Sequence, residues 1–549
     1  MTDLLSGPVE AGGGVSVYGA EAVDRSAPAS ARSALVAAGV PGRMSARDAG
    51  PGGAGSVGGA RTGLGWLDTH RRSRELLPQL AELCDELGDL EHVVVVGTGA
   101  AALASAAIAR TTGRPLTVLD GVDPVRVRAA LGDRLERTVV VLADGAGSSP
   151  ATDALRRVYR QAFLDTGRTA AEAGRHFVVV TEPDSPLVET AAELGAFVVL
   201  AEPAGGGRFA ALDASALVPA ALAGVEVVEL LDQAEELAGA LGGERDNPGL
   251  ALGAALGAAA TNGRDRVALL PDGSGLDGLG DWIAQLLAGA TGRDGVGILP
   301  VVMEAPGSPG STGPDVLSVS YGGALRAGAV PGGGASPDLA VVGPLGAQFL
   351  TWQYAAAVAA EVLGVDPFDR SGVAAAEREA ERLLAQRGPT GTPTFVEGSI
   401  EVYGPTAGPR DLAGSLAALL AGIGAGGYLA VQAYLDPSAD ADAARLRPLL
   451  AAATGRTVTF DWAARALAGA GQYHRGGPPL GSFLHLTGAA DNDLPVPDRP
   501  YTLGELQAAQ AAGDRAALRR RDRPLLRLHL TDRAAGLSQL LHAVRNLRS

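Results

Sequence analysis

The sequence contains no lysine, so all 45 basic residues are arginines. This absence excludes a Schiff-base lysine and a phosphate-binding lysine ammonium group from any mechanism. Arginine is outnumbered by 61 acidic residues, which gives a net charge of −16. Because binding to a nucleic-acid backbone depends on clustered positive charge, we expect no nucleic-acid partner.

Cysteine is almost absent as well. Cys84 stands alone, so an intramolecular disulfide is excluded, and a reducing cytoplasm is the expected location. The seven histidines are scattered without metal-ligand spacing, so we expect no metal site and no cofactor. The first residues have neither a basic nor an apolar signal region, and no apolar run reaches about 18 residues, so we expect no secretory signal and no membrane span.

The chain begins with few large apolar residues. Residues 1–60 are rich in glycine, alanine and serine, and "RDAGPGGAGSVGGAR" at 47–61 is typical of a flexible linker. We therefore predict that residues 1–60 form an irregular N-terminal segment.

Short apolar runs then alternate with helix-like stretches. Continuous apolar strands separated by helices predict an α/β fold with parallel sheets covered on both faces. Five runs predict a first domain over 61–225, four predict a second over 226–400, and four more predict a C-terminal α/β region over 401–549. These runs lie at 93–96, 116–119, 138–142, 177–180 and 197–200, then at 267–270, 296–303, 316–321 and 339–342, and finally at 428–434, 457–460, 482–487 and 525–530.

The stretch "VVVLADGAGSSPATDAL" at 139–155 has the shape of a phosphate-binding turn. A buried strand is followed by small and hydroxyl residues and then by the start of a helix, where backbone N–H groups favour anions. Asp144 stands at the mouth of this turn without a basic neighbour, and its carboxylate would repel a phosphate. The alternative interpretation is an ordinary strand–turn–helix junction with Asp144 as a turn or cap residue.

Four further stretches occur in an order that identifies a family. Together with 93–105 and 139–155, they resemble glucose-6-phosphate isomerase, closest to the actinobacterial branch that is also found fused to transaldolase. The resemblance covers roughly 60–549 and implies two sugar-isomerase (SIS) domains, a phosphorylated hexose as ligand and a homodimer. The four stretches are "GGGRFAALDASALVPAALAGV" (205–225), "PDGSGLDGLGDWIAQL" (271–286), "VVGPLGAQFLTWQYAAAVAAEVLGVDPFD" (341–369) and "GQYHRGGPPLGSFLHLTG" (471–488).

The resemblance also assigns site residues. It implies that Arg208 steadies the charge of an enediolate intermediate and that His474 is a candidate acid–base group. The substrate-binding positions that it implies are Gly97, Gly99, Gly147, Ser148, Ser149, Gln285 and Gln472.

Several positions depart from the family pattern. Gly289 stands where the family carries the glutamate that moves the proton, and Ala101 and Ala102 replace the hydroxyls of the first phosphate turn. Loss of the base predicts little glucose/fructose 6-phosphate isomerisation, the glycolytic and gluconeogenic reaction of the family. Three functions stay open from the sequence: an isomerase despite Gly289, a non-catalytic phosphosugar sensor or partner of an active paralogue, and a changed chemistry that uses His474 or a nearby carboxylate.

Overall fold

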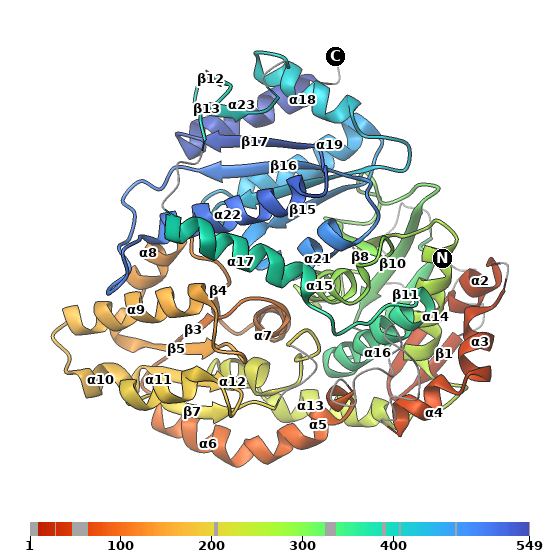
Figure 1. The fold of residues 1–549 in the computed structure, drawn as a ribbon. Helices are drawn as coiled ribbons and strands as arrows, with labels where there is room; N and C mark the ends of the chain where they lie inside the picture. Colours follow the sequence, from red (N-terminus) through yellow and green to blue (C-terminus); the bar gives the residue numbers. More distant parts are fainter. Residues whose placement is uncertain are drawn as a thin grey trace.

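The protein consists of three sheets with helices packed around them (Figure 1). The computed structural model describes residues 9–27, 29–46, 64–202, 207–323, 336–386, 391–405, 408–466 and 469–547. Most strand pairs are parallel, which confirms the predicted α/β class. None of the helices in these ranges is long and apolar enough to cross a membrane.

The first sheet is wholly parallel, with strand order β4-β3-β5-β6-β7. Its central strands are buried along their whole length, which explains their unbroken valine runs. The strands are β3 (His92–Val96), β4 (Thr117–Leu119), β5 (Thr138–Ala143), β6 (Phe177–Thr181) and β7 (Phe197–Leu200). The associated helices are α5 (Thr69–Arg72), α6 (Leu77–Glu86), α7 (Ala100–Thr111), α8 (Pro124–Gly132), α9 (Pro150–Asp165), α10 (Ala170–Arg175), α11 (Pro186–Leu194) and α12 (Ala214–Leu222).

The second sheet has the order β1-β2-β11-β10-β8-β9. Its four later strands are parallel, and helices α14 and α16 pack against each other beside them. The parallel strands are β8 (Arg266–Pro271), β9 (Leu299–Val302), β10 (Val316–Gly322) and β11 (Leu339–Val342). The helices are α13 (Val227–Ala238), α14 (Pro248–Thr261), α15 (Leu279–Thr291) and α16 (Leu345–Leu363).

The prediction of an irregular segment over 1–60 is wrong for its described part. A hairpin of β1 (Val9–Gly12) and β2 (Val15–Tyr18) adds antiparallel strands to β11, and α2 (Ala20–Arg25), α3 (Ala31–Ala37) and α4 (Val40–Ser45) follow. Val15 and Val17 are buried in this hairpin. Four-residue strands give too short a pattern to detect, and they are stabilised by the sheet edge they join. The predicted linker at 47–61 lies outside the described residues.

The third sheet has the order β12-β13-β17-β16-β14-β15. It begins before the predicted boundary near residue 400, because β12 pairs with β13 as an antiparallel edge. The strands are β12 (Phe395–Glu397), β13 (Ile400–Tyr403), β14 (Tyr428–Tyr434), β15 (Val458–Trp462), β16 (Gly481–Gly488) and β17 (Leu525–Leu530). The helices are α18 (Leu412–Ala421), α19 (Leu446–Thr454), α20 (Ala463–Ala466), α21 (Ala470–Gly476), α22 (Leu503–Arg519) and α23 (Arg533–Asn546).

Helix α17 (Ser371–Gln386) joins the second and third sheets in the chain and packs along α22, as Figure 1 shows. The helix therefore lies with the C-terminal region, although the sequence assigns it to 226–400. The boundaries between the three predicted domains stay predictions.

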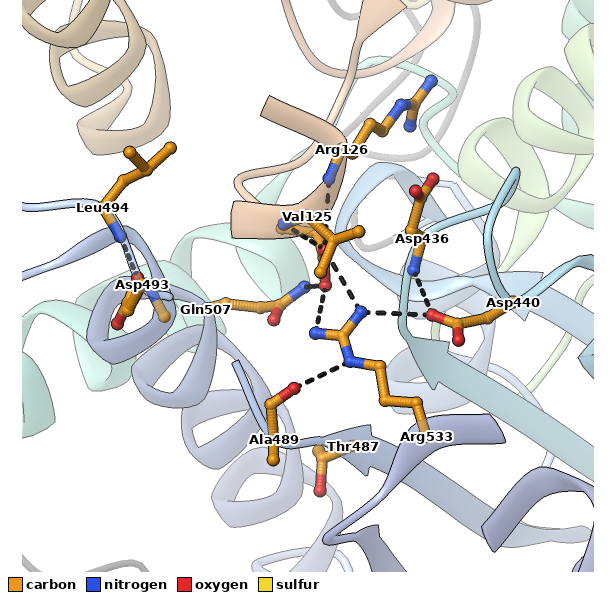
Figure 2. A network of polar contacts seen from close by, with 12 residues as sticks. Val125, Arg126, Asp436, Asp440, Thr487, Ala489, Asp493, Leu494, Gln507 and Arg533 are labelled. Atoms are coloured by element: carbon orange, nitrogen blue, oxygen red, sulfur yellow. Dashed lines mark hydrogen bonds and ion pairs between the residues drawn. The ribbon is translucent and has the colours of Figure 1, made fainter. Parts of the chain in front are cut away.

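A buried cluster of charges connects the first and third sheets (Figure 2). Arg533 of α23 forms ion pairs with Asp123 at 2.9 Å and Asp440 at 3.1 Å, and its Nε donates to the Ala489 carbonyl at 2.8 Å. Asp123 also accepts the backbone N–H of Val125 as the N-cap of α8. One guanidinium group thus holds two carboxylates from segments that are far apart in the sequence.

Replacing Arg533 with alanine should lower the free energy of unfolding by about 3–5 kcal/mol, because Asp123 and Asp440 would stay buried without their cation. Arg545→Ala removes an exposed arginine from the same helix and should change the free energy of unfolding by less than about 0.5 kcal/mol. Urea denaturation of both variants measures the difference. Equal losses would contradict a clamping role for Arg533.

Candidate functional site

The turn after β5 is held by its own carboxylate. Asp144 accepts the backbone N–H of Gly147 at 3.0 Å and of Ser149 at 3.1 Å. These are N–H groups that a phosphate would use in such a turn. Asp144 therefore acts as a turn residue, as the interpretation of an ordinary strand–turn–helix junction predicts. Its carboxylate accepts the same backbone N–H groups that a phosphate would bind.

The same turn leads into α9. The side chain of Ser149 accepts the backbone N–H of Thr152 at 3.3 Å and so caps the helix. A cavity of about 600 Å³ opens beside the turn, and Gly147, Ser148 and Ser149 are among the residues that line it. Three predicted binding residues thus share one cavity wall.

Gly97 and Gly99 lie at the end of the neighbouring strand β3. A Cβ atom on Gly97 would come within 2.6 Å of the Ala143 carbonyl oxygen, so only glycine allows β3 and β5 to approach at this point. Gly99 has φ +91° at the start of α7, a conformation that favours glycine. Both glycines shape the backbone at the carboxyl edge of the first sheet.

Arg208 is positioned by its neighbour in the sequence. The Phe209 ring lies 5.0 Å from the Trp66 ring and 5.2 Å from the Phe368 ring, measured between centroids. Gln353 of α16 donates to the Phe209 carbonyl at 2.6 Å. Three separate segments therefore fix the backbone from which the Arg208 side chain extends.

The Arg208 side chain lies directly on Gly289 of α15. A Cβ atom on Gly289 would come within 2.5 Å of the Arg208 Nε, which is closer than any real side chain tolerates. The Arg208 Nη1 donates to the Pro367 carbonyl at 2.6 Å. In the part of the chain that the structure describes, this is the one protein hydrogen bond of Arg208, which is only 7% exposed and forms no ion pair there.

The charges that surround this guanidinium are of both signs, from Arg293, Arg370, Asp366 and Asp369. Burial lowers the pKa of Arg208 to about 9, and the Arg293 and Arg370 guanidiniums contribute to this lowering. Arg293 is itself paired with Asp369 at 3.0 Å, and it donates to the Gly289 carbonyl at 3.2 Å. Sequence reasoning missed Arg293 and Asp369, although both lie in or beside motifs that carry the family resemblance.

Gln285 and Gln472 also lie around α15. Gln285 is one turn before Gly289, and its Nε2 donates to the Arg465 carbonyl at 3.3 Å. Gln472 donates to the Gly292 carbonyl at 3.3 Å, just beyond the end of α15. The structure thus brings Arg208, Gln285 and Gln472 together around one helix, while the turn at 144–149 belongs to the first sheet.

His474 is placed against the third sheet. It is buried, its Nδ1 lies 2.9 Å from the Tyr428 hydroxyl, and its ring stacks on Tyr428 with centroids 5.6 Å apart. The Phe483 ring packs edge-on against it at 5.2 Å. The His474 Nε2 lies 3.8 Å from the Asp461 carboxylate and has no hydrogen-bond partner among the described residues. A catalytic role for His474 stays a prediction.

Two solved structures of α/β proteins align with much of this chain. A hypothetical protein from Thermus thermophilus aligns with a TM-score of 0.53 and 21% identity over 67% of this chain and 96% of its own. A glucose-6-phosphate isomerase from Chlamydia trachomatis aligns with a TM-score of 0.50 and 19% identity over 58% of this chain and 74% of its own. At these identities the likeness establishes the fold alone.

Sequence comparison finds similar proteins over part of the chain. The chain is 35% identical over 224 residues to a probable glucose-6-phosphate isomerase from Haloarcula marismortui, covering 39% of this chain and 50% of the relative. It is 27% identical over 253 residues to a glucose-6-phosphate isomerase from Carboxydothermus hydrogenoformans, covering 42% and 53%. The predicted resemblance is confirmed: the chain is homologous to glucose-6-phosphate isomerases over this stretch. It spans about half the length of these curated relatives, and no family model matches it.

Arg208→Met should leave the free energy of unfolding unchanged or raise it, because it removes a buried charge that has no carboxylate partner among the described residues. The matched control is Arg475→Met, since Arg475 is also buried but pairs with Asp514 at 2.6 Å. This control should lose about 3–5 kcal/mol. Urea denaturation compares the two, and an equal loss in Arg208→Met would show that Arg208 is a structural residue.

Asp144→Ser should free the N–H groups of Gly147 and Ser149. Loss of two hydrogen bonds to a carboxylate should lower the free energy of unfolding by about 2 kcal/mol, while the affinity for inorganic phosphate should rise about tenfold. Asp144→Asn keeps an acceptor without the charge and should show smaller effects on both. Thermal melts with and without phosphate measure them. An unchanged phosphate shift in Asp144→Ser would show that the carboxylate does not compete with an anion for this turn.

Proposed function

We propose that this chain binds a phosphorylated hexose in the site around Arg208 and does not isomerise it. The observation that carries the proposal is the contact between Arg208 and Gly289. Among the described residues, the buried Arg208 guanidinium has no counter-ion, and Gly289 beside it has no side chain that could act as a base. The sequence relatives named as glucose-6-phosphate isomerases support a phosphosugar as the ligand class.

The cost of burying charge supports ligand binding. A guanidinium that is nine-tenths buried, and bonded within the described chain only to a carbonyl, is unfavourable in the empty protein. Proteins retain such groups where a ligand supplies the missing negative charge or acceptors. The anchoring of Phe209 by Trp66, Phe368 and Gln353 holds the guanidinium ready for that ligand.

The residues around the guanidinium support the absence of catalysis. Isomerisation needs a base within hydrogen-bond reach of the sugar carbons. Gly289 has no side chain, and its helix neighbours Ala288 and Ala290 cannot accept a proton. The nearby carboxylate of Asp369 is bound to Arg293 and to Ser371.

A homodimer and a cytoplasmic location remain expectations, the first from the family resemblance and the second from the single cysteine. Neither bears on the choice between binding and catalysis.

A coupled assay at high enzyme concentration should detect little or no conversion of glucose 6-phosphate to fructose 6-phosphate, because the loss of a general base alone lowers the rate by about 10²–10⁴-fold. Calorimetry on the same preparation should detect phosphosugar binding that weakens in Arg208→Ala. Robust turnover that Arg208→Ala abolishes would contradict the proposal, because it could not come from a contaminating isomerase.

A further inference from the structure

The C-terminal region concentrates positive charge in an otherwise acidic chain. The stretch "RAALRRRDRPLLR" at 515–527 contains six arginines, although the whole chain carries a net charge of −16. Arg515 and Arg519 lie on α22, and Arg527 lies on β17, against which α22 packs. Arg519 and Arg527 both act on the charge of Arg515, and Arg519 also acts on that of Arg527. The three guanidiniums are therefore close enough to repel one another.

Arg515 is a buried cation without a protein partner. It is only 6% exposed, and it forms neither an ion pair nor a hydrogen bond in the part of the chain that the structure describes. The carboxylate of its neighbour Asp514 is bound to Arg475 at 2.6 Å. Burial, helped by the charges of Arg527 and Arg519, lowers the pKa of Arg515 to about 10. Because buried polar groups nearly always have partners, the partner of Arg515 is expected to come from outside the chain.

The other two arginines extend this position to the surface. The Arg527 guanidinium lies 4.1 Å above the centroid of the Tyr403 ring, and the Tyr403 hydroxyl donates to Glu401 at 2.6 Å. This stacking orients a side chain that is itself 5% exposed. Arg519 lies one helical turn after Arg515 and is exposed. A ligand can therefore approach the buried guanidiniums from the side of Arg519.

The charges of this group do not balance. Glu401 is the carboxylate that acts on Arg527, while Asp514 is neutralised by Arg475. His529, next to Arg527 on the same strand, stays neutral at pH 7 because burial lowers its pKa. Three guanidiniums and one carboxylate leave two positive charges in excess. Like charges four residues apart on a helix are destabilising, so this excess has a cost in the empty protein.

We propose that Arg515, Arg519 and Arg527 form a second anion site, whose ligand is a phosphate group of inorganic phosphate or of a phosphate monoester. A phosphate dianion matches the excess of two charges, and its oxygens accept hydrogen bonds from several guanidiniums at once. Water could accept the same hydrogen bonds, but it would leave the repulsion between the guanidiniums in place.

This site is distinct from the one around Arg208. The charges that act on Arg208 come from Arg293, Arg370, Asp366 and Asp369, and none of them is among those that act on Arg515. The inference therefore goes beyond the proposed function and does not rest on it.

Calorimetric titration with inorganic phosphate at constant ionic strength tests the site. The full chain carrying Arg208→Met is the starting protein, since this substitution removes the cation of the first site. Addition of Arg515→Met should weaken phosphate binding at least about tenfold, as expected for the loss of one charge-assisted pair. Arg521→Met is the matched control, because Arg521 is exposed and donates to the Ala517 carbonyl. It should change the affinity less than about twofold. Equal weakening by both substitutions would show only general attraction of anions and would overturn the inference.

Arg515→Lys keeps the test decisive if Arg515→Met does not fold. Lysine retains the charge but lacks the planar pair of donors, so the phosphate affinity should fall by a smaller factor than with methionine. Unchanged affinity in every Arg515 variant that folds would overturn the inference. So would the absence of phosphate binding at millimolar concentration in the starting protein.

The same starting protein identifies the source of the phosphate group. Glucose 6-phosphate that binds as tightly as inorganic phosphate, and that Arg515→Met weakens, would support the site and show that it accepts an ester. Binding of inorganic phosphate alone would support a site for the free ion. If the unmodified protein binds phosphate through Arg515 but binds no phosphosugar through Arg208, the second site stands and the proposed function fails.

Discussion

The close contact between Arg208 and Gly289 is the constraint on which the site depends. The guanidinium can lie on α15 only because residue 289 has no Cβ atom, and its Nη1 then reaches the Pro367 carbonyl. Arg293 binds the Gly289 carbonyl and Asp369, so the same short stretch of helix also positions the segment that contains Pro367. One missing side chain therefore determines both the packing and the charge of the site.

The turn after β5 and the surroundings of Arg208 differ in the negative charge that the protein itself supplies. In the turn after β5, Asp144 brings an internal carboxylate to backbone N–H groups that would otherwise face a ligand. On α15, Gly289 supplies no carboxylate, and the buried Arg208 guanidinium has no ion pair within the described chain. The protein thus supplies a carboxylate at the turn after β5 and supplies none that pairs with Arg208. We therefore expect a negatively charged ligand to bind at Arg208 rather than at the turn.

Much of the fold was predictable because buried parallel strands have continuous apolar sequences, as in Val93–Val96 and Val139–Leu142. The hairpin of β1 and β2 was not, because its strands are four residues long and depend on the edge of β11. Motif order pointed to Arg208 and to Gly289 at the position of the base. The partner of Arg208 could not be predicted, since Pro367 contributes a backbone carbonyl and leaves no side-chain pattern. The motif around His474 suggested chemistry but could not predict its packing against Tyr428 and Phe483, and its role stays a prediction.

The central claim is that Arg208 binds a phosphorylated hexose, and a crystal structure of the complex with glucose 6-phosphate tests it most directly. We predict that an oxygen atom of the ligand accepts a hydrogen bond from the Arg208 guanidinium, at an N···O distance of about 2.7–3.2 Å, beside Gly289. A ligand bound elsewhere, or one that leaves Arg208 bonded only to the Pro367 carbonyl, would contradict the claim.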